Sequence, residues 1–370
     1  MSTTMRAARL HVTGQPFQVD EIPIPEPTAA DVLVRVKACA LVPNLRNVVT
    51  HYPNWFPQLP LPKLPAIYGL DATGEIAALG PDVKGLEVGQ RVYVDPMRYC
   101  GTCLKCRSGR PLDCSYLIMS GYFGASAGGQ EMFNRYPWGG LAEYLIAPGS
   151  SMVALPDSVS FESAARFGYL GTSHSALRKA GAGPGTSVLI NGATGTVGVG
   201  AVLLCLGLGI TKILAVARNV ELLEKLRQLA PGRIFTHSTL AGPCTDWARA
   251  QTGGAGADIV IETLSPGAPA QATMDAFLAT ARMGKIVTVG GAEEPLPFDP
   301  QWLMQNNISY IGSGWFSVAE AHGMAEMVGA GVVDLSVIEN ICFGLDEVNE
   351  ALDFACNRAV GGFCNTIVRP

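Results

Sequence analysis

The sequence has little charge for its length: 15% of its 370 residues are Asp, Glu, Lys or Arg, and the formal net charge is -5. It contains no run rich in Lys and Arg, so nucleic acid is excluded as an expected partner. The opening segment MSTTMRAARLHVTGQ lacks the long apolar core of a secretion signal, and we expect a cytoplasmic protein. The low charge also fits extensive buried sheet and a subunit interface.

One long segment lacks charge altogether, between Lys179 and Lys212, and it would be long enough to cross a membrane. It contains Pro184 and nine glycines, however, and Asn191 stands in its middle. A strand, a glycine turn and a buried helix explain this composition better than a membrane helix does. We therefore expect no membrane partner.

Apolar residues make up 48% of the chain, enough to bury a full core. At roughly 100–200 residues per domain, the length predicts two domains. In the first part, residues 32–40 and 89–94 have strand composition. Proline is dense in residues 22–27 and from Pro53 to Pro65, which predicts loops and short strands there rather than helices.

The pattern changes near residue 160, after which apolar strands alternate with helical segments. This alternation predicts an α/β domain with a doubly wound parallel sheet. The expected strands are residues 188–191, 212–217, 233–237, 257–264, 285–291 and 308–314. In the tail, residues 343–355 predict a helix with Asp346 in its N-cap region, and residues 361–368 predict a strand. Both would close back onto the first domain.

A glycine-rich turn, with Gly192, Gly195 and Gly198, separates the first of these strands from an apolar helix. Glycine lets the backbone approach a pyrophosphate, and the helix N-terminus offers it N–H groups and a positive dipole end. The alternative is a tight turn without a ligand, but strand, turn, helix and next strand together predict a dinucleotide site. The predicted cofactor contacts are Gly192, Thr194, Gly195, Thr196, Val197, Gly198, Arg218, Asn219, Gly290 and Gly291.

The end of the second strand favours NADPH over NADH. A carboxylate at this point usually accepts hydrogen bonds from the ribose hydroxyls. Here Ala217 is followed by Arg218 and Asn219, and no acid stands at the position. Arg218 could pair with a 2′-phosphate through two parallel hydrogen bonds. The alternative is a solvated surface arginine.

Four of the ten cysteines are clustered in the pattern C-x2-C-x2-C-x7-C, with Lys105 and Arg107 among them to offset thiolate charge. Four thiolates so close in sequence can surround one Zn²⁺ tetrahedrally and leave no position open, which predicts a structural ion. Free thiols and an iron–sulfur cluster are the alternatives. The predicted ligands are Cys100, Cys103, Cys106 and Cys114.

Together these motifs resemble the medium-chain dehydrogenase/reductase family, the superfamily of zinc alcohol dehydrogenases and quinone reductases. The resemblance also includes residues 74–92, GGLAEYLIAP at 139–148, and the tail. It implies a GroES-like β-rich domain (1–160 and 325–370, with a zinc lobe at 95–118) and a Rossmann domain (161–324). It further implies an active-site cleft between the domains and a homodimer or homotetramer.

The chain departs from the family pattern at the catalytic zinc. The positions that hold this ion in zinc alcohol dehydrogenases correspond here to Val42, to Gly69-Leu70-Asp71 and to Gly168, and the proton-relay position corresponds to Asn44. None of these forms a plausible ligand set. The resemblance therefore implies a member that kept the structural zinc and lost the catalytic one.

Without a Lewis acid, polarising a simple ketone is harder. Family members that lack catalytic zinc usually reduce activated C=C bonds, quinones or iminium-like carbons, so we expect an NADPH-dependent reductase of that kind. Ordinary hydrogen-bond donors can hold a developing enolate; the candidates are Asn44, His51 and Tyr52, with Tyr169 and His174 as others. Aromatic residues at 122–124 and 133–138 could line a pocket for an apolar or aromatic substrate, or form an oligomer contact.

Two rival functions stay open. The chain could be an alcohol dehydrogenase with an unrecognised ligand set that includes Cys39 and Asp71. It could also be a sensor that binds NADPH without turnover, because a fold alone does not establish an activity.

Overall fold

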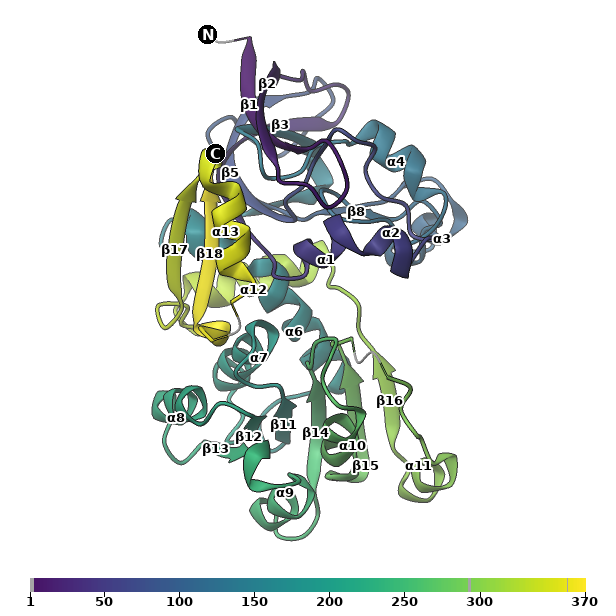
Figure 1. Cartoon of the computed structure of the whole chain (residues 1–370), viewed down its shortest axis with the longest axis vertical. Helices are drawn as coiled ribbons and strands as arrows, with labels where there is room; N and C mark the ends of the chain where they lie inside the picture. Colours follow the sequence, from purple (N-terminus) through teal and green to yellow (C-terminus); the bar gives the residue numbers. More distant parts are fainter. Residues whose placement is uncertain (1–2, 292–293, 358) are drawn as a thin grey trace. The chain divides into compact units, whose positions relative to one another are not determined.

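The computed structural model describes residues 3–291, 294–357 and 359–370. The chain forms two compact units (Figure 1). Unit 1 comprises Met1–Gly168, Glu339–Ala359 and Asn365–Pro370, and unit 2 comprises Tyr169–Ile338 and Val360–Cys364. The divisions therefore fall at 168/169 and 338/339, where the expected boundaries were 160/161 and 324/325.

Unit 1 is built mainly from antiparallel strands. Its largest sheet has the order β10-β6-β5-β3-β18-β17, and β9 also pairs with β3. The long strand β3 is buried along most of its length because sheet neighbours and core side chains cover it. The strands are β1 (Thr4–Leu10), β2 (Gln18–Pro23), β3 (Asp31–Ala40), β4 (Ala66–Ile67), β5 (Asp71–Leu79), β6 (Arg91–Val94), β7 (Met97–Arg98), β8 (Ile118–Met119), β9 (Tyr144–Pro148), β10 (Met152–Ala154), β17 (Glu339–Gly344) and β18 (Cys364–Arg369).

The helices of unit 1 are short: α1 (Leu45–Thr50), α2 (Tyr52–Trp55), α3 (Leu104–Arg107), α4 (Gly129–Arg135), α5 (Phe161–Ala164) and α13 (Val348–Ala355). The prediction that the Pro-rich run contains no helix was wrong, because α2 begins just before it at Tyr52 and extends into it as far as Trp55. Pro53 occupies the first turn of α2, where its missing N–H has no partner to lose. The tail helix also begins later than predicted, since residues 343 and 344 belong to β17.

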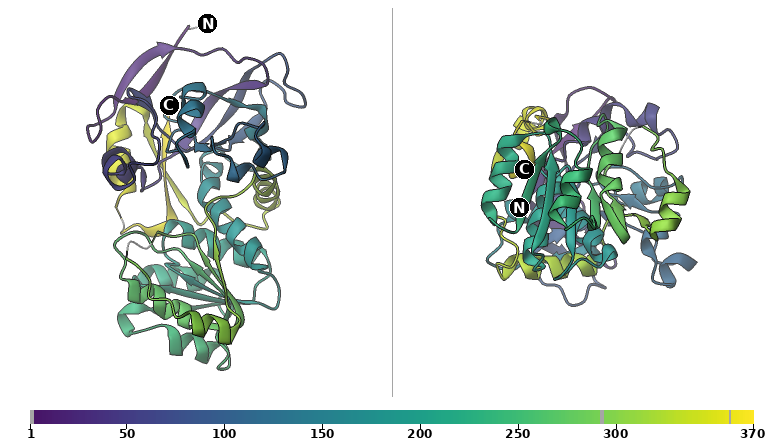
Figure 2. Two further views of the ribbon diagram at one scale, coloured as in Figure 1. Left: turned by 90° about the vertical axis from the view of Figure 1, so that its right-hand side faces the viewer. Right: turned by 90° about the horizontal axis from the view of Figure 1, so that it is seen from below.

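Unit 2 contains a six-stranded parallel sheet in the order β13-β12-β11-β14-β15-β16, which confirms the doubly wound fold. Helices cover both faces of this sheet (Figure 2). Its strands are β11 (Ser187–Asn191), β12 (Lys212–Ala217), β13 (Ile234–Ser238), β14 (Ala257–Glu262), β15 (Thr280–Thr288) and β16 (Ser309–Gly312). Its helices are α6 (Phe167–Ala180, which begins in unit 1), α7 (Thr196–Gly207), α8 (Val220–Leu229), α9 (Thr245–Gln251), α10 (Ala270–Leu278), α11 (Pro300–Asn306) and α12 (Val318–Gly329).

The order of the strands reverses between β11 and β14, and this point positions the ligand site. Every residue of β11 is buried, as expected for a strand covered on both faces. In a doubly wound sheet, ligands bind outside the carboxyl ends of the strands at such a reversal. The glycine-rich turn begins at the carboxyl end of β11.

The described part of the chain contains no helix with both the length and the apolar character that a membrane crossing requires. The charge-free segment folds as the end of α6, β11 and α7, as its composition predicts.

Candidate functional site

The four predicted zinc ligands come together in unit 1. The Sγ atoms of Cys100 and Cys106 are 4.0 Å apart, those of Cys103 and Cys106 3.5 Å, those of Cys103 and Cys114 3.9 Å, and those of Cys114 and Cys100 3.6 Å. A tetrahedral ion about 2.3 Å from each sulfur would place the sulfurs about 3.8 Å apart. The spacing therefore fits one zinc ion, whereas a multi-iron cluster would hold the sulfurs farther apart.

Backbone donors support this cysteine site. The N–H of Cys103 donates to Sγ of Cys100 at 3.3 Å, and the N–H of Tyr116 donates to Sγ of Cys114 at 3.4 Å. Lys105, expected to offset the thiolate charge, instead forms an ion pair with Asp113 at 2.8 Å. Across residues 3–291, 294–357 and 359–370, these cysteines are the only group of three or more potential metal ligands.

The glycine-rich turn of unit 2 has the geometry that phosphate binding needs. Gly192 adopts a φ of 85°, which favours glycine. A Cβ at Gly198 would come within 2.3 Å of the carbonyl oxygen of Gly192, so only glycine permits the close approach of α7 to the turn. Gly195 is the N-cap of α7 and has no side chain to cap the first N–H groups. A phosphate can therefore accept from the helix N-terminus.

A second segment borders this turn, and sequence reasoning missed it. The N–H of Gly362 donates to the carbonyl oxygen of Thr194 at 2.7 Å. A Cβ at Gly362 would come within 2.2 Å of the carbonyl oxygen of Gly195. Residues 361–363, predicted as strand, form a 3-10 turn instead, because they pack directly against the turn. Nothing local in the sequence signals this contact.

Beneath the turn, a buried carboxylate links two strand ends. Asn191 donates from Nδ2 to Oε2 of Glu262 at 2.7 Å, and the N–H of Leu264 donates to Oε1 at 2.7 Å. Burial raises the pKa of Glu262 to about 7 although these hydrogen bonds lower it. Gly290 lies next to the same loop, where a Cβ would come within 2.3 Å of the carbonyl oxygen of Leu264.

Arg218 lies directly after the carboxyl end of β12 and is exposed. Within the described ranges, no hydrogen bond or ion pair engages its guanidinium group. Its neighbour Asn219 is the N-cap of α8, where the side chain accepts from the N–H of Leu222 at 3.0 Å. The Asn219 side chain thus caps α8, and the guanidinium of Arg218 is available to bind an anionic ligand.

The three positions at which ligands of a catalytic zinc are expected to be missing lie in unit 1. Val42 and Leu70 are buried apolar residues. A Cβ at Gly168 would meet the two carboxylate oxygens of Asp71 at 2.1 and 2.4 Å. The space into which a third ligand at residue 168 would extend is therefore occupied by the carboxylate of Asp71, from β5.

Asp71 is fully buried, and this burial raises its pKa to about 7. The hydroxyl of Tyr93 donates to Oδ1 at 2.8 Å, and the Tyr93 hydrogen bond, the Arg166 guanidinium and a backbone contact to Gly168 act in the opposite direction. Cys39, the other residue of the rival ligand set, is also buried. No third ligand joins these two residues in the part of the chain that the structure describes.

Two of the three candidate donors come together, and the third does not. Asn44 donates from Nδ2 to the hydroxyl of Tyr52 at 3.0 Å and to that of Tyr122 at 2.7 Å. The ring of His51 instead stacks on Trp55, with centroids 4.8 Å apart, and is exposed. Sequence reasoning did not place Tyr122 with Asn44, because 78 residues separate them.

The other aromatic and histidine candidates are divided between surface and core. Phe123 packs against Tyr52, whereas Phe133 and Tyr136 belong to a hydrophobic core in unit 1. Phe133 and Tyr136 are therefore core residues of unit 1. His174 is buried in unit 2, and this burial lowers its pKa.

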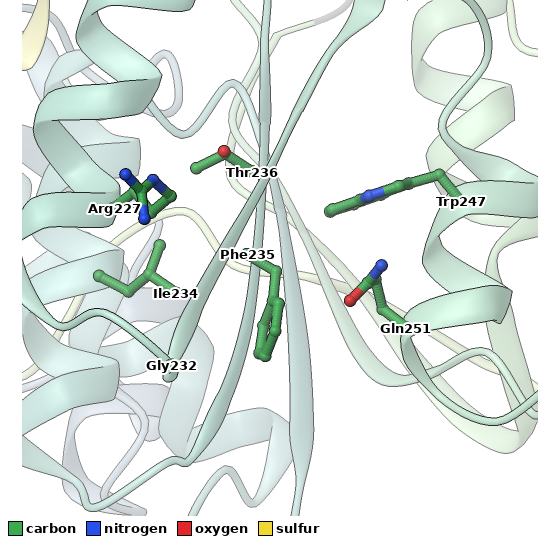
Figure 3. Close-up of a pocket in the computed structure, with 7 residues that line it drawn as sticks. All are labelled: Arg227, Gly232, Ile234, Phe235, Thr236, Trp247 and Gln251. Atoms are coloured by element: carbon green, nitrogen blue, oxygen red, sulfur yellow. The ribbon is translucent and has the colours of Figure 1, made fainter.

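A surface hollow of about 290 Å³ in unit 2 contains none of the predicted site residues. It is lined from both faces of the edge strand β13: Figure 3 shows Arg227 on one side, and Trp247 and Gln251 from α9 on the other.

The chain is similar to known proteins in sequence and in fold. Residues 28–157 match the family model of the alcohol dehydrogenase GroES-like domain, and residues 196–330 match that of the zinc-binding dehydrogenases. An alcohol dehydrogenase of Geobacillus stearothermophilus is 32% identical over 314 residues, which is 84% of each chain. An NAD-dependent alcohol dehydrogenase of Sulfurisphaera tokodaii is 28% identical over 365 residues, 96% of this chain and 98% of the other. The crystal structure of an NAD-dependent alcohol dehydrogenase superposes with a TM-score of 0.82 at 26% identity, covering 99% of this chain and 100% of that one.

Proposed function

We propose a specific activity for this chain, which belongs to the medium-chain dehydrogenase/reductase superfamily of NAD(P)-dependent oxidoreductases. It reduces an activated C=C bond or a quinone with NADPH and dispenses with a catalytic zinc. An iminium-like carbon, which is similarly electron-poor, is a further substrate of the same kind. The observation that carries this proposal is the filling of the third ligand corner at Gly168 by the carboxylate of Asp71.

The ligand positions support the loss of catalytic zinc by their chemistry. Val42 and Leu70 offer only hydrocarbon, and Gly168 has no side chain. Zinc in proteins takes thiolate, imidazole or carboxylate ligands, usually three of them in a catalytic site. Asp71 alone could supply one, and Tyr93 already donates a hydrogen bond to it. The zinc that we assign is the single structural ion of the four-cysteine site.

The choice of NADPH is supported by Arg218. Its exposed guanidinium follows β12 at the point where a carboxylate would bind the ribose hydroxyls of NADH. The guanidinium fork suits the 2′-phosphate of NADPH instead. The relative from Sulfurisphaera tokodaii is named NAD-dependent, so coenzyme preference is a property to be measured on this chain.

Without a catalytic metal, the substrate must accept the hydride at an electron-poor carbon. When bound, the reduced nicotinamide supplies that hydride. Negative charge then develops on the conjugated oxygen, and neutral donors can stabilise it. Unit 1 brings Asn44 and Tyr52 together, and because both N–H groups of Asn44 already donate to phenols, we assign the oxygen to the Tyr52 hydroxyl.

The alternative function is oxidation of an alcohol or reduction of a simple ketone. The name of the relative from Geobacillus stearothermophilus, an alcohol dehydrogenase, favours it. A matched set of six-membered rings separates the two functions, because 2-cyclohexen-1-one, cyclohexanone and cyclohexanol differ only at the reacting bonds.

The test is NADPH oxidation with 2-cyclohexen-1-one, 1,4-benzoquinone and cyclohexanone, together with NADP⁺ reduction by cyclohexanol. We expect turnover of the enone or the quinone and little with the saturated pair. Turnover of cyclohexanol and cyclohexanone alone would overturn the proposal in favour of an alcohol dehydrogenase. Tight NADPH binding without any turnover would favour a sensor. Sedimentation of the same sample tests the homodimer or homotetramer that we propose.

A further inference from the structure

A single amide joins two phenols in unit 1. Asn44 places one N–H of Nδ2 on the Tyr52 oxygen at 3.0 Å and the other on the Tyr122 oxygen at 2.7 Å. Its own Oδ1 accepts from Nδ2 of Asn47 at 2.9 Å, which fixes the direction of the amide. All four side chains therefore hold one another in a defined orientation.

The same amide gives up a common structural role. Asn44 is the N-cap of α1, a position where an asparagine side chain normally accepts from an N–H of the first helical turn. Here the side chain makes no such hydrogen bond. The backbone of Asn44 has helical angles (φ -69°, ψ -11°), and its side chain donates to the two phenols instead.

The hydrogen bonds define the direction of the Tyr52 hydroxyl. Its oxygen accepts from Asn44, so its hydrogen must point elsewhere. No residue among those that the structure describes accepts this hydrogen, and the Tyr52 side chain is partly exposed. Tyr52 therefore presents an O–H donor to a ligand.

Aromatic surface surrounds this donor. The Tyr52 ring lies 4.9 Å from that of Phe56 and 5.3 Å from that of Phe123, measured between centroids. Phe56 is 40% exposed, and Trp55, which lies in α2 with Tyr52, is 48% exposed. A flat conjugated group can pack against such faces, while its oxygen reaches the phenol.

We propose that Tyr52 is a catalytic residue that donates to the carbonyl oxygen of an aryl-conjugated or similarly flat enone or enal, and that Asn44 positions it. This inference rests on the proposed function and narrows its substrate class. The hydride adds to the β-carbon, the C=C π bond breaks, and the electron pair moves to the carbonyl oxygen. Tyr52 donates its proton there, and water returns a proton to Tyr52. The enol then becomes the saturated ketone, and one NADPH and one proton are consumed.

The test uses trans-4-phenyl-3-buten-2-one, an enone with an aryl group, and NADPH with the full chain. We expect Tyr52→Phe to lower kcat on the order of 100-fold, as for loss of an acid or an oxyanion donor, with KM changed by less than about threefold. Asn44→Asp keeps the size but accepts the phenol proton, so we expect kcat to fall at least about tenfold. Tyr144→Phe is the matched control, because it removes a phenol on β9 that accepts from Arg35 on β3.

A binding measurement covers the case in which turnover is weak. The 4-nitrophenolate ion, which presents an aromatic ring and an oxyanion, should bind the NADP⁺-loaded protein at least about tenfold more weakly after Tyr52→Phe. Urea midpoints confirm that each variant is folded.

The outcomes separate the two proposals. If the wild-type chain reduces the enone and Tyr52→Phe matches it in both kcat and phenolate binding, the assignment of Tyr52 is wrong and the reductase function stands. A rise in KM with unchanged kcat in Tyr52→Phe would also overturn the assignment, because Tyr52 would then contribute to substrate binding only. If the wild-type chain oxidises cyclohexanol and ignores every enone, both proposals fall.

Discussion

The carboxylate of Asp71 lies where the side chain of residue 168 would have to stand. An ideal Cβ on Gly168 would come within 2.1 Å of Oδ1 of Asp71. The two residues are far apart in sequence and meet because the start of β5, at Asp71, lies against the first turn of α6, which contains Gly168. Glycine at 168 and aspartate at 71 therefore depend on each other, because a side chain at residue 168 would collide with the carboxylate.

The contact between Gly168 and Asp71 predicts how a methyl group added at residue 168 affects stability. Gly168→Ala should lower the free energy of unfolding by about 1–3 kcal/mol, the usual effect of overpacking a core. In an Asp71→Ala background the added methyl group should be tolerated, because the carboxylate is gone. Urea denaturation of the two single variants and the double variant measures the coupling. Additive losses would mean that the two side chains do not compete for the same space.

The metal in the cysteine site should stabilise the fold. Cys103→Ser replaces one thiolate of the four-sulfur set, and we expect the zinc content to fall by about one ion per chain, with a lower unfolding midpoint. Cys342, an exposed cysteine outside the cluster, provides the control Cys342→Ser, which should keep its zinc. A zinc-free Cys103→Ser chain as stable as wild type would show that the cluster is not structural.

Arg218 should discriminate between the two coenzymes. Loss of a charge-assisted contact to the 2′-phosphate removes about 1.5–3 kcal/mol, so Arg218→Ala should weaken NADPH binding about 10- to 100-fold and leave NADH almost unchanged. Fluorescence titration with both coenzymes measures this. Arg227→Ala is the matched control, because Arg227 on α8 already pairs with Glu224 at 2.6 Å. Equal weakening of both coenzymes by Arg218→Ala would refute the 2′-phosphate assignment.

Glu262 should make the stability depend on pH. Burial raises its pKa from an ordinary value of 4.5 to about 7. Since the folded state holds the proton more tightly, the contribution to stability is fully present below pH 4.5 and is lost as pH rises through about 7. Relative to wild type, Glu262→Gln should therefore gain up to about 1–3 kcal/mol between about pH 5 and about pH 8.

Urea denaturation at several pH values measures this difference, and the exposed Glu326→Gln serves as the control. A difference between Glu262→Gln and wild type that stays constant across the pH range would mean that Glu262 is ionised throughout.

Much of the fold can be predicted from local sequence patterns, whereas the candidate site can be predicted only in part. Buried apolar runs such as β12 identify strands because both faces of a parallel sheet are covered. The cysteine site and the glycine turn are recognisable because their chemistry depends on spacing within a few residues. In contrast, α2 was missed because Pro53 suggests a loop unless its place in a first helical turn is known.

The contacts that decide chemistry are mostly long-range. Tyr122 reaches Asn44, and Gly362 reaches Thr194, across separations that leave no periodic or local signal in one sequence. From the sequence, Asp71 is a departure from the family's zinc-ligand pattern and, with Cys39, a member of a rival ligand set. Its role in filling the corner at Gly168 depends on a side-chain position that only the folded chain defines.

The measurement that tests the central claim most directly is the zinc content per chain of the active protein, with enone reduction assayed on the same sample. We predict one zinc ion per chain, held by the four cysteines, together with NADPH-dependent reduction of 2-cyclohexen-1-one or 1,4-benzoquinone. Two zinc ions per chain, with turnover of cyclohexanol that disappears when the second ion is removed, would contradict it.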